Sequence, residues 1–302
     1  MTTTDQTTTD QNPTRVRIAH SPDSDDAFMF YALTQGILDT EGLDISHVLN
    51  DIETLNQAAF EGTYEITAIS FHAYAYLQDR YRVMPSGASF GDDYGPVIVA
   101  REGMAPADLA GKKVAIPGKL TTATLTLGLW CRAHGIEVET GIVSFDEILD
   151  VVASGEYAAG VVIHEGQLTY GDEGLALVED LGVWWHGETD GLPLPLGCNV
   201  IRRDLPEDLQ HRLCRLLRQS IDYALDHREE ALDYAIRYAR GLEDDVERSD
   251  RFVGMYVNDW TRSYGEAGRE AVRRLLDRAH DEGLLEERVE VDFVDPEATG
   301  EG

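Results

Sequence analysis

The chain has 302 residues, of which 43% are hydrophobic, as is typical of a globular protein with one large domain or two of ordinary size. Its formal net charge is -31, from 56 acidic and 25 basic residues, so its surface repels nucleic acid and anionic membranes. No apolar run approaches the roughly 20 residues that a helix needs to span a bilayer.

The charge is carried by dispersed Asp and Glu rather than by one acidic tail. Lysine occurs only at Lys112, Lys113 and Lys119, so nearly all basic residues are Arg. This composition is typical of a protein that works in concentrated salt, where self-repulsion is screened. We therefore expect a halophilic cytoplasm.

The acidic surface predicts that the free energy of unfolding rises with KCl concentration, because added ions screen the repulsion between carboxylates. Unfolding curves recorded over a series of KCl concentrations measure this dependence. A chain that is fully folded in dilute buffer would contradict the halophilic interpretation.

The cysteines and the N-terminal segment indicate a reducing compartment. Cys131, Cys198 and Cys214 are odd in number and widely spaced, which indicates neither a disulfide framework nor a zinc site. Residues 1–14 are rich in Thr, Asp, Gln and Asn and lack the apolar segment of a secretory signal. We expect a disordered tail there, a second tail from residue 295, and a cytoplasmic protein.

The first third of the chain alternates strands with helices. Strands are expected at 15–20, 43–48 and 65–70, and helices at 27–35, 52–60 and 71–79. This order predicts a parallel sheet with helices on its faces.

The pattern restarts after a strand-like segment at 97–100, and the chain ends in helices. Further strands are expected at 112–116, 137–144, 158–163, 175–180 and 199–202, and helices at 121–134, 146–154, 206–226, 228–240, 244–260 and 266–282. Residues 191–197 (GLPLPLG) form a rigid link.

Two successive α/β units joined by two extended links predict two domains with a ligand cleft between them. In this interpretation residues 15–98 and 200–302 form a discontinuous first domain, and residues 99–199 form the second. A single, wider doubly wound domain remains the alternative.

Polar residues directly follow four predicted strands, at the edge of the sheet where open α/β folds bind ligands. They are His20-Ser21, Ser70, Thr121-Thr122-Ala123 and His164. His164 can exchange a proton near neutral pH, or be a structural histidine. The Thr121-Thr122-Ala123 helix start can hold a carboxylate or phosphate through its first N–H groups, or simply be capped by threonine. Ser70 has the same two readings.

Three other features of the sequence give weaker support for a functional site. Asp23, Asp25 and Asp26 lack the ligand order of a calcium loop, so capping of the following helix is favoured over a metal site. No histidine pair has metal-ligand spacing, and no metal is expected. The pair Trp184-Trp185 either covers an aromatic ligand or packs at a domain edge.

Several blocks together resemble one family. They are His20-Ser21-Pro22 with Asp26, Phe28 to Leu33, Tyr94-Gly95-Pro96, Thr121-Thr122-Ala123, Ile163 to Tyr170, Asp180-Leu181-Gly182 with Trp184-Trp185, and Gly191 to Gly197. In this order they resemble the 1,4-dihydroxy-6-naphthoate synthases of the futalosine route to menaquinone. The match runs from Arg15 to beyond Arg202, and the helical tail adds little to it.

The resemblance implies a two-domain α/β fold of the type II periplasmic-binding-protein kind, used as a cytoplasmic enzyme. It implies a lyase that cleaves cyclic dehypoxanthinyl futalosine to 1,4-dihydroxy-6-naphthoate and a small dihydroxy ketone, without a redox cofactor. His164 matches the family's proposed general base, and Thr122-Ala123 and Ser70 match its ligand contacts. The partner is a small carboxylate substrate, which a helix start suits.

The chain also departs from the family. Members often carry a Cys-Pro-Asn-Asp-like run where this chain has Asp23-Ser24-Asp25-Asp26, which leaves that loop without an expected role in ligand binding. Glu165, Gln167 and Tyr170 are the candidates for orienting His164.

Two other functions remain open. Chorismate dehydratase, a sister enzyme, shares the fold and a carboxylate substrate, but the 163–170 and 191–197 blocks favour the naphthoate synthase. A solute-binding protein of a transporter has the same fold, and the polar N-terminus argues against it.

Overall fold

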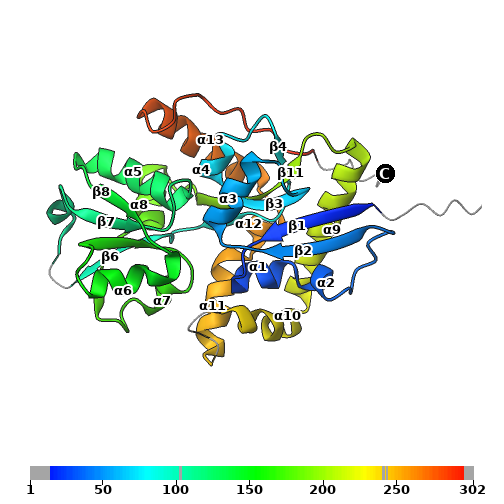
Figure 1. Ribbon diagram of the computed structural model, residues 1–302, viewed down its shortest axis with the longest axis horizontal. Helices are drawn as coiled ribbons and strands as arrows, with labels where there is room; N and C mark the ends of the chain where they lie inside the picture. Colours follow the sequence, from blue (N-terminus) through cyan, green and yellow to red (C-terminus); the bar gives the residue numbers. More distant parts are fainter. Residues whose placement is uncertain (1–13, 102–103, 240–241, 243, 296–302) are drawn as a thin grey trace, which may run out of the picture.

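The computed structural model describes residues 14–101, 104–239, 242 and 244–295. It holds two β-sheets flanked by helices, which form two domains side by side (Figure 1). Apart from Thr14 and Asp295, the tails expected at 1–14 and from 295 lie outside the described residues. In the part that is described, no helix is both long and apolar enough to cross a membrane.

The first sheet has the strand order β2-β1-β3-β11-β4, and β5 pairs with β11. Its strands are β1 (Arg15–His20), β2 (Asp44–Leu49), β3 (Ile66–Ser70), β4 (Tyr81–Val83), β5 (Ser89–Gly91) and β11 (Leu194–Arg202). β1 runs parallel to β2 and β3, as the alternation of strands and helices predicts. β11 is antiparallel to β3, because the chain enters it on its way back from the second domain.

Helices from both ends of the chain cover this sheet. They are α1 (Ser24–Met29), α2 (Tyr31–Thr34), α3 (Ile52–Phe60), α4 (Phe71–Tyr74), α9 (Glu207–Asp226), α10 (Arg228–Ala235), α11 (Val246–Tyr256), α12 (Asp259–Arg262) and α13 (Gly265–Asp281). The short 3₁₀ helix η3 (Ile236–Tyr238) follows α10. The helix expected at 27–35 is thus two short helices that meet at Phe30. The start of α3 is capped by Asp51, whose Oδ1 accepts from Thr54 N at 3.0 Å.

The second sheet has the order β10-β6-β9-β7-β8. Its strands are β6 (Val97–Arg101), β7 (Lys113–Ile116), β8 (Glu139–Ile142), β9 (Ala159–Val162) and β10 (Leu175–Asp180). β7 is parallel to β8 and β9, whereas β6 is antiparallel to both β9 and β10.

Apolar residues pack on both faces of the second sheet. α5 (Thr122–His134) and α8 (Leu181–Glu188) bury Trp130 and Leu181 on one face. α6 (Ile148–Ala153) buries Ile148 and Val152 on the other. The remaining helices of this domain are α7 (Gly166–Thr169) and the 3₁₀ helices η1 (Pro106–Leu109) and η2 (Phe145–Glu147). Burial on both faces explains why β6 and β9, which lie inside this sheet, are almost entirely apolar.

The chain crosses between the domains twice. It leaves the first sheet after β5 and enters the second at Val97, close to the predicted boundary at 98/99. It returns earlier than the predicted boundary at 199/200, because β11 pairs with β5 and β3 from Leu194 onward. Residues 194–197 of the expected 191–197 link therefore belong to a strand of the first sheet.

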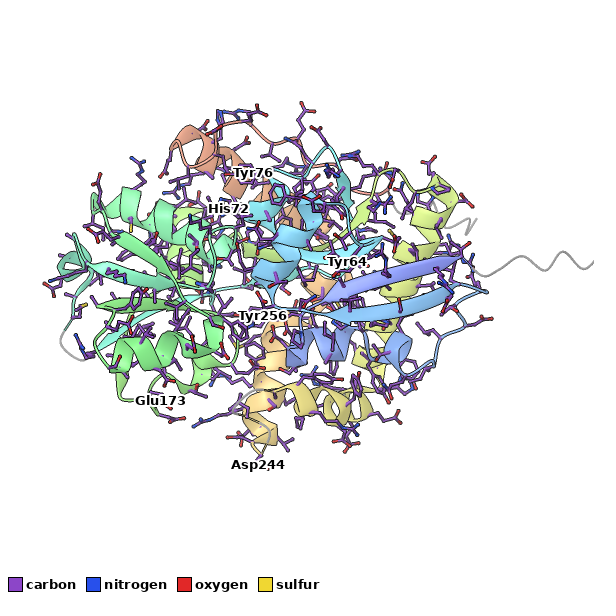
Figure 2. All side chains as sticks on the ribbon, viewed as in Figure 1. Tyr64, His72, Tyr76, Glu173, Asp244 and Tyr256 are labelled. Carbon is purple, nitrogen blue, oxygen red and sulfur yellow. The ribbon has the colours of Figure 1, made fainter. Side chains whose placement is uncertain are left out.

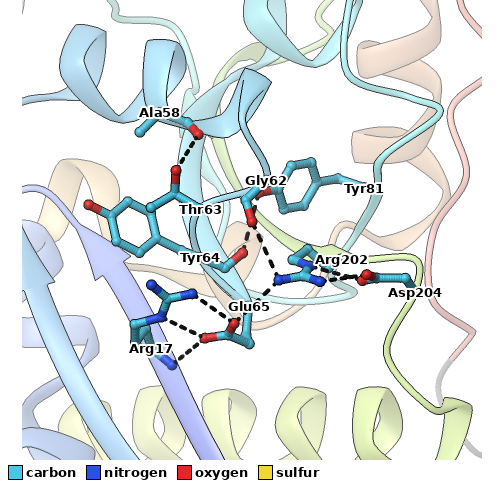
Figure 3. Close-up of polar contacts among 9 residues, drawn as sticks. All are labelled: Arg17, Ala58, Gly62, Thr63, Tyr64, Glu65, Tyr81, Arg202 and Asp204. Atoms are coloured by element: carbon cyan, nitrogen blue, oxygen red, sulfur yellow. Dashed lines mark hydrogen bonds and ion pairs between the residues drawn. The ribbon is translucent and has the colours of Figure 1, made fainter.

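An ion-pair network ties three strands of the first sheet together at the edge shown in Figure 3. Glu65 accepts from Arg17 Nε at 3.1 Å and from Arg202 Nη1 at 3.4 Å. Burial raises the pKa of Glu65, but its hydrogen bonds with Arg17 and the charge there outweigh burial and lower it. The network lies where β1 and β3 begin. The opposite ends of these strands face the cavity between the domains.

Candidate active site

A cavity of about 130 Å³ lies between the two domains. Its wall combines loops after β1, β3 and β9, the start of α5, the crossover strand β11, and α11. Figure 2 shows Tyr256 of α11 where the two domains meet. All four predicted strand-end positions contribute to this wall, although His20 itself does not line it.

His164 stands in the turn after β9, in a backbone conformation that is uncommon for residues other than glycine, with φ of 67°. Its Nδ1 lies 3.0 Å from Oδ2 of Asp23, which belongs to the first domain. Its Nε2 is buried and has no hydrogen-bond partner among the described residues, while the residue lines the cavity. The edge of the ring packs with Phe145 at 4.5 Å between centroids.

Two opposing effects set the protonation of His164. Burial lowers its pKa, because an imidazolium ion is poorly solvated there. The Asp23 carboxylate, by charge and hydrogen bond, and then Glu165 and Asp25 by charge, outweigh burial and raise the pKa to about 9. His164 is therefore a basic imidazole held by an anionic neighbour.

The carboxyl groups of the loop after β1 lie close together, so each one that is ionised disfavours ionisation of the others. Burial, with Asp23 and Glu165 nearby, raises the pKa of Asp25 to about 7. Burial and the charges of Asp25 and Asp23 raise the pKa of Asp26 well above its usual value. Asp26 nevertheless accepts from Ser21 N at 2.7 Å, which folds the loop toward the cavity.

The structure corrects two expectations about this loop. Asp23 occupies the N-cap position of α1 but makes no side-chain cap, because its carboxylate is used by Ser21 and His164. The loop was expected to have no role at the site, yet Asp23, Asp25 and Asp26 all line the cavity. Among the described residues, no three His, Cys, Asp or Glu side chains are arranged to hold a metal ion.

Ser70 ends β3 and lines the cavity. Its side chain does not cap the helix that follows. Asn56 fixes it, since Ser70 N donates to Asn56 Oδ1 at 2.9 Å and Asn56 Nδ2 donates to Ser70 Oγ at 3.3 Å. The hydroxyl proton of Ser70 is thereby left to donate to a ligand.

The Thr121-Thr122-Ala123 segment lines the cavity at the start of α5. Thr121 is the N-cap, and its Oγ1 accepts from Thr124 N at 3.3 Å. The Thr122 hydroxyl donates to Leu196 O at 2.6 Å, which joins α5 to the crossover strand β11. The N–H groups of Thr122 and Ala123 have no acceptor within the helix and carry the positive end of its dipole. The backbone N–H groups, rather than the threonine hydroxyls, are therefore the donors at this helix start that suit an anion.

Other sequence candidates lie outside the cavity. His20 stacks on Phe30 and its Nε2 lies 3.1 Å from His47 Nδ1, so burial lowers its pKa to about 3 and keeps it neutral. Trp185 is fully buried and donates from Nε1 to Pro193 O at 3.1 Å. It therefore packs inside the protein, the second of the two roles considered for the tryptophan pair.

The expected partners of His164 are used elsewhere. Glu165 accepts from Ser24 Oγ at 2.8 Å, and Gln167 accepts from Tyr256 OH at 2.8 Å. Both bonds join the two domains. Tyr170 packs against the apolar core on one face of the second sheet.

Asn199 and Tyr256 are among the polar cavity residues that were not predicted from the sequence. Asn199 donates from Nδ2 to Gly87 O at 2.8 Å, and its buried Oδ1 has no partner among the described residues. Tyr256 reaches the cavity from the C-terminal helices. Neither lies at the end of a strand in the predicted parallel sheets. A search for polar residues at strand ends therefore does not find them.

The geometry agrees with what three comparisons find. Residues 16–281 match the model of a protein family described as menaquinone biosynthesis. The chain is 44% identical over 269 residues to the 1,4-dihydroxy-6-naphthoate synthase of Thermus thermophilus, covering 89% of this chain and 95% of that one. It is 36% identical over 273 residues to the enzyme of the same name from Streptomyces coelicolor, covering 89% and 94%.

Solved structures give the same fold. A protein from Archaeoglobus fulgidus is 49% identical, with a TM-score of 0.84 over 90% of this chain and 98% of that one. The alkanesulfonate-binding protein of Xanthomonas axonopodis is 16% identical, with a TM-score of 0.67 over 93% and 97%. The fold is thus the two-domain type II fold of periplasmic binding proteins.

Proposed function

The chain belongs to the menaquinone biosynthesis family, and we propose that it is a 1,4-dihydroxy-6-naphthoate synthase that cleaves cyclic dehypoxanthinyl futalosine. The single observation that carries this proposal is His164 in an interdomain cavity: its imidazole is largely buried, has a carboxylate on Nδ1, and has no partner on Nε2 among the described residues. The two synthases that it resembles over 89% of its length support the substrate.

In the proposed reaction, neutral His164 removes a substrate hydroxyl proton through Nε2. A positioned base of this kind contributes about 10²–10⁴-fold in rate. The alkoxide becomes a carbonyl as the adjacent carbon–carbon bond breaks, and the bonding electron pair stays with the fragment that becomes aromatic. His164 then returns the proton to an oxygen of that fragment. The reaction is therefore that of a carbon–carbon lyase.

The substrate carboxylate is proposed to bind at the start of α5. The N–H groups of Thr122 and Ala123 meet it with the positive end of the helix dipole, and Ser70 Oγ donates a further hydrogen bond. Enclosure between two domains keeps water away from the reacting atoms.

The experiment that tests the function compares three candidate activities of the purified protein in concentrated KCl. We expect conversion of cyclic dehypoxanthinyl futalosine to 1,4-dihydroxy-6-naphthoate and no dehydration of chorismate. Dehydration of chorismate would favour the sister enzyme. Tight binding of a transported solute by a protein inert on both substrates would favour a solute-binding protein. Neighbouring genes for menaquinone enzymes, rather than permease subunits, would agree with the enzyme.

The variant Ser70→Ala is expected to raise KM about 10-fold with kcat nearly unchanged, because it removes a hydrogen bond made equally in ground and transition states. Steady-state kinetics measure KM and kcat separately. Ser86→Ala is the matched control, because Ser86 is equally buried but does not line the cavity. An unchanged KM for Ser70→Ala would remove Ser70 from the binding site.

A cytoplasmic location is part of the proposal. Cys131, Cys198 and Cys214 are all free thiols, which fits a reducing compartment.

A further inference from the structure

We propose that Asp23 is the positioning residue of His164, and that the two domains each contribute one member of this Asp–His pair. The proposal rests on the function proposed above, since it assigns a role to the neighbour of the base.

The two side chains come from different domains and meet in the wall of the cavity. Asp23 lies in the loop between β1 and α1 of the first domain, and His164 follows β9 of the second. Oδ2 of Asp23 lies 3.0 Å from His164 Nδ1, and its side chain is only 3% exposed. The same oxygen accepts a short hydrogen bond from Ser21 Oγ, which holds the carboxylate in place.

This pairing determines which ring nitrogen can act as a base. When Nδ1–H donates to Asp23, the neutral imidazole carries its lone pair on Nε2. Nε2 is the atom left without a partner among the described residues, on a residue that lines the cavity. A carboxylate on Nδ1 also stabilises the imidazolium ion that forms when Nε2 takes the proton.

Other contacts between the domains surround the pair. Ser24 Oγ donates to Glu165 at 2.8 Å beside it, and Arg248 contacts Asp172 at 2.6 Å on the exposed rim. In this structure the contact between the base and its carboxylate is therefore one of several contacts that join the two domains.

Among the described residues, four carboxyl groups interact electrostatically with His164. Asp23, Asp25 and Asp26 lie in the loop after β1, and Glu165 adjoins His164. In the described part of the chain only Asp23 makes a hydrogen bond to the ring, so its loss should have the largest effect.

Asp23→Asn tests the proposal, because asparagine keeps an acceptor for Nδ1–H but removes the charge. Activity requires neutral His164, so kcat/KM rises with pH as His164 loses its proton. Without the carboxylate, burial dominates and the pKa of His164 falls. We expect the acidic limb of the kcat/KM–pH profile, where activity rises with pH, to move to lower pH by about one pH unit or more. We expect kcat to fall on the order of 10²-fold.

Two further variants make the result specific. Asp172→Asn makes the same chemical change at the exposed interdomain contact, and is expected to leave the acidic limb in place. Asp23→Glu restores a carboxylate and is expected to return the limb toward its wild-type position with reduced kcat. A limb that stays in place in Asp23→Asn, or that moves equally in Asp172→Asn, would overturn the proposal.

A readout independent of turnover separates this proposal from the proposed function. The ¹⁵N imidazole signal of His164 is identified as the one absent from His164→Asn, and is titrated in wild-type protein and in Asp23→Asn. We expect it to titrate at lower pH in Asp23→Asn, even if the protein is inert on cyclic dehypoxanthinyl futalosine. Identical titrations would overturn the Asp–His pair, whatever reaction the protein catalyses.

Discussion

Replacing His164 by asparagine is expected to lower kcat by about 10²–10⁴-fold while leaving substrate binding nearly unchanged, because it removes the base that we propose takes the substrate proton. Asparagine is the most suitable replacement. His164 has a positive φ of 67°, a conformation that asparagine adopts more readily than alanine. The measurement is single-turnover product formation beside equilibrium binding of the substrate.

The control for this variant is His47→Asn, which removes an imidazole that does not line the cavity. It is expected to leave kcat nearly unchanged. Normal turnover by a correctly folded His164→Asn would show that another group takes the proton. Loss of binding together with turnover would show that His164 holds the substrate rather than reacting with it.

Replacing Gly182 by alanine is expected to lower the free energy of unfolding by about 3 kcal/mol, through overpacking at the crossover between the domains. An added Cβ on Gly182 would lie 1.9 Å from the carbonyl oxygen of Tyr94. Gly95 faces it, and a Cβ there would lie 2.8 Å from Gly182 N. Because these neighbours are backbone atoms, no side-chain rotation relieves the clash. The contact packs the 94–96 and 180–182 segments tightly against each other.

Gly187, in the same helix, is the matched control. It has no atom within 4 Å of an added Cβ, so Gly187→Ala is expected to be neutral or to stabilise by up to ~1 kcal/mol. Denaturant unfolding in concentrated KCl measures both variants. Equal stability of Gly182→Ala and wild type would show that the crossover can shift to make room.

The main features of the site could be predicted from the sequence because they follow a local rule. Polar residues after apolar strand patterns fall at the ligand-binding edge of an α/β sheet. Ser70, the start of α5 and His164 satisfy this rule, and the structure brings all three to one cavity. The rule does not say which way a side chain points, and His20 turns away to stack on Phe30.

The partner of His164 could not be predicted by the same means. The candidates Glu165, Gln167 and Tyr170 are near in sequence, whereas Asp23 is brought close only when two separate sheets face each other. The loop that holds Asp23 was given no role because it departs from the family pattern. The available signal was a carboxylate three residues past the end of β1, a strand of the other sheet.

The helical tail shows the same limit. Its apolar periodicity predicts helices, but not that α11 packs beside the cavity and places Tyr256 in its wall. The antiparallel direction of β11 also depends on a crossover between domains, which strand patterns do not encode.

The most direct test of the proposed function is product formation by wild-type protein in concentrated KCl with cyclic dehypoxanthinyl futalosine as the only substrate. We predict that 1,4-dihydroxy-6-naphthoate accumulates in step with substrate loss, and that His164→Asn forms almost none. Folded wild-type protein that leaves the substrate intact would contradict the proposed function.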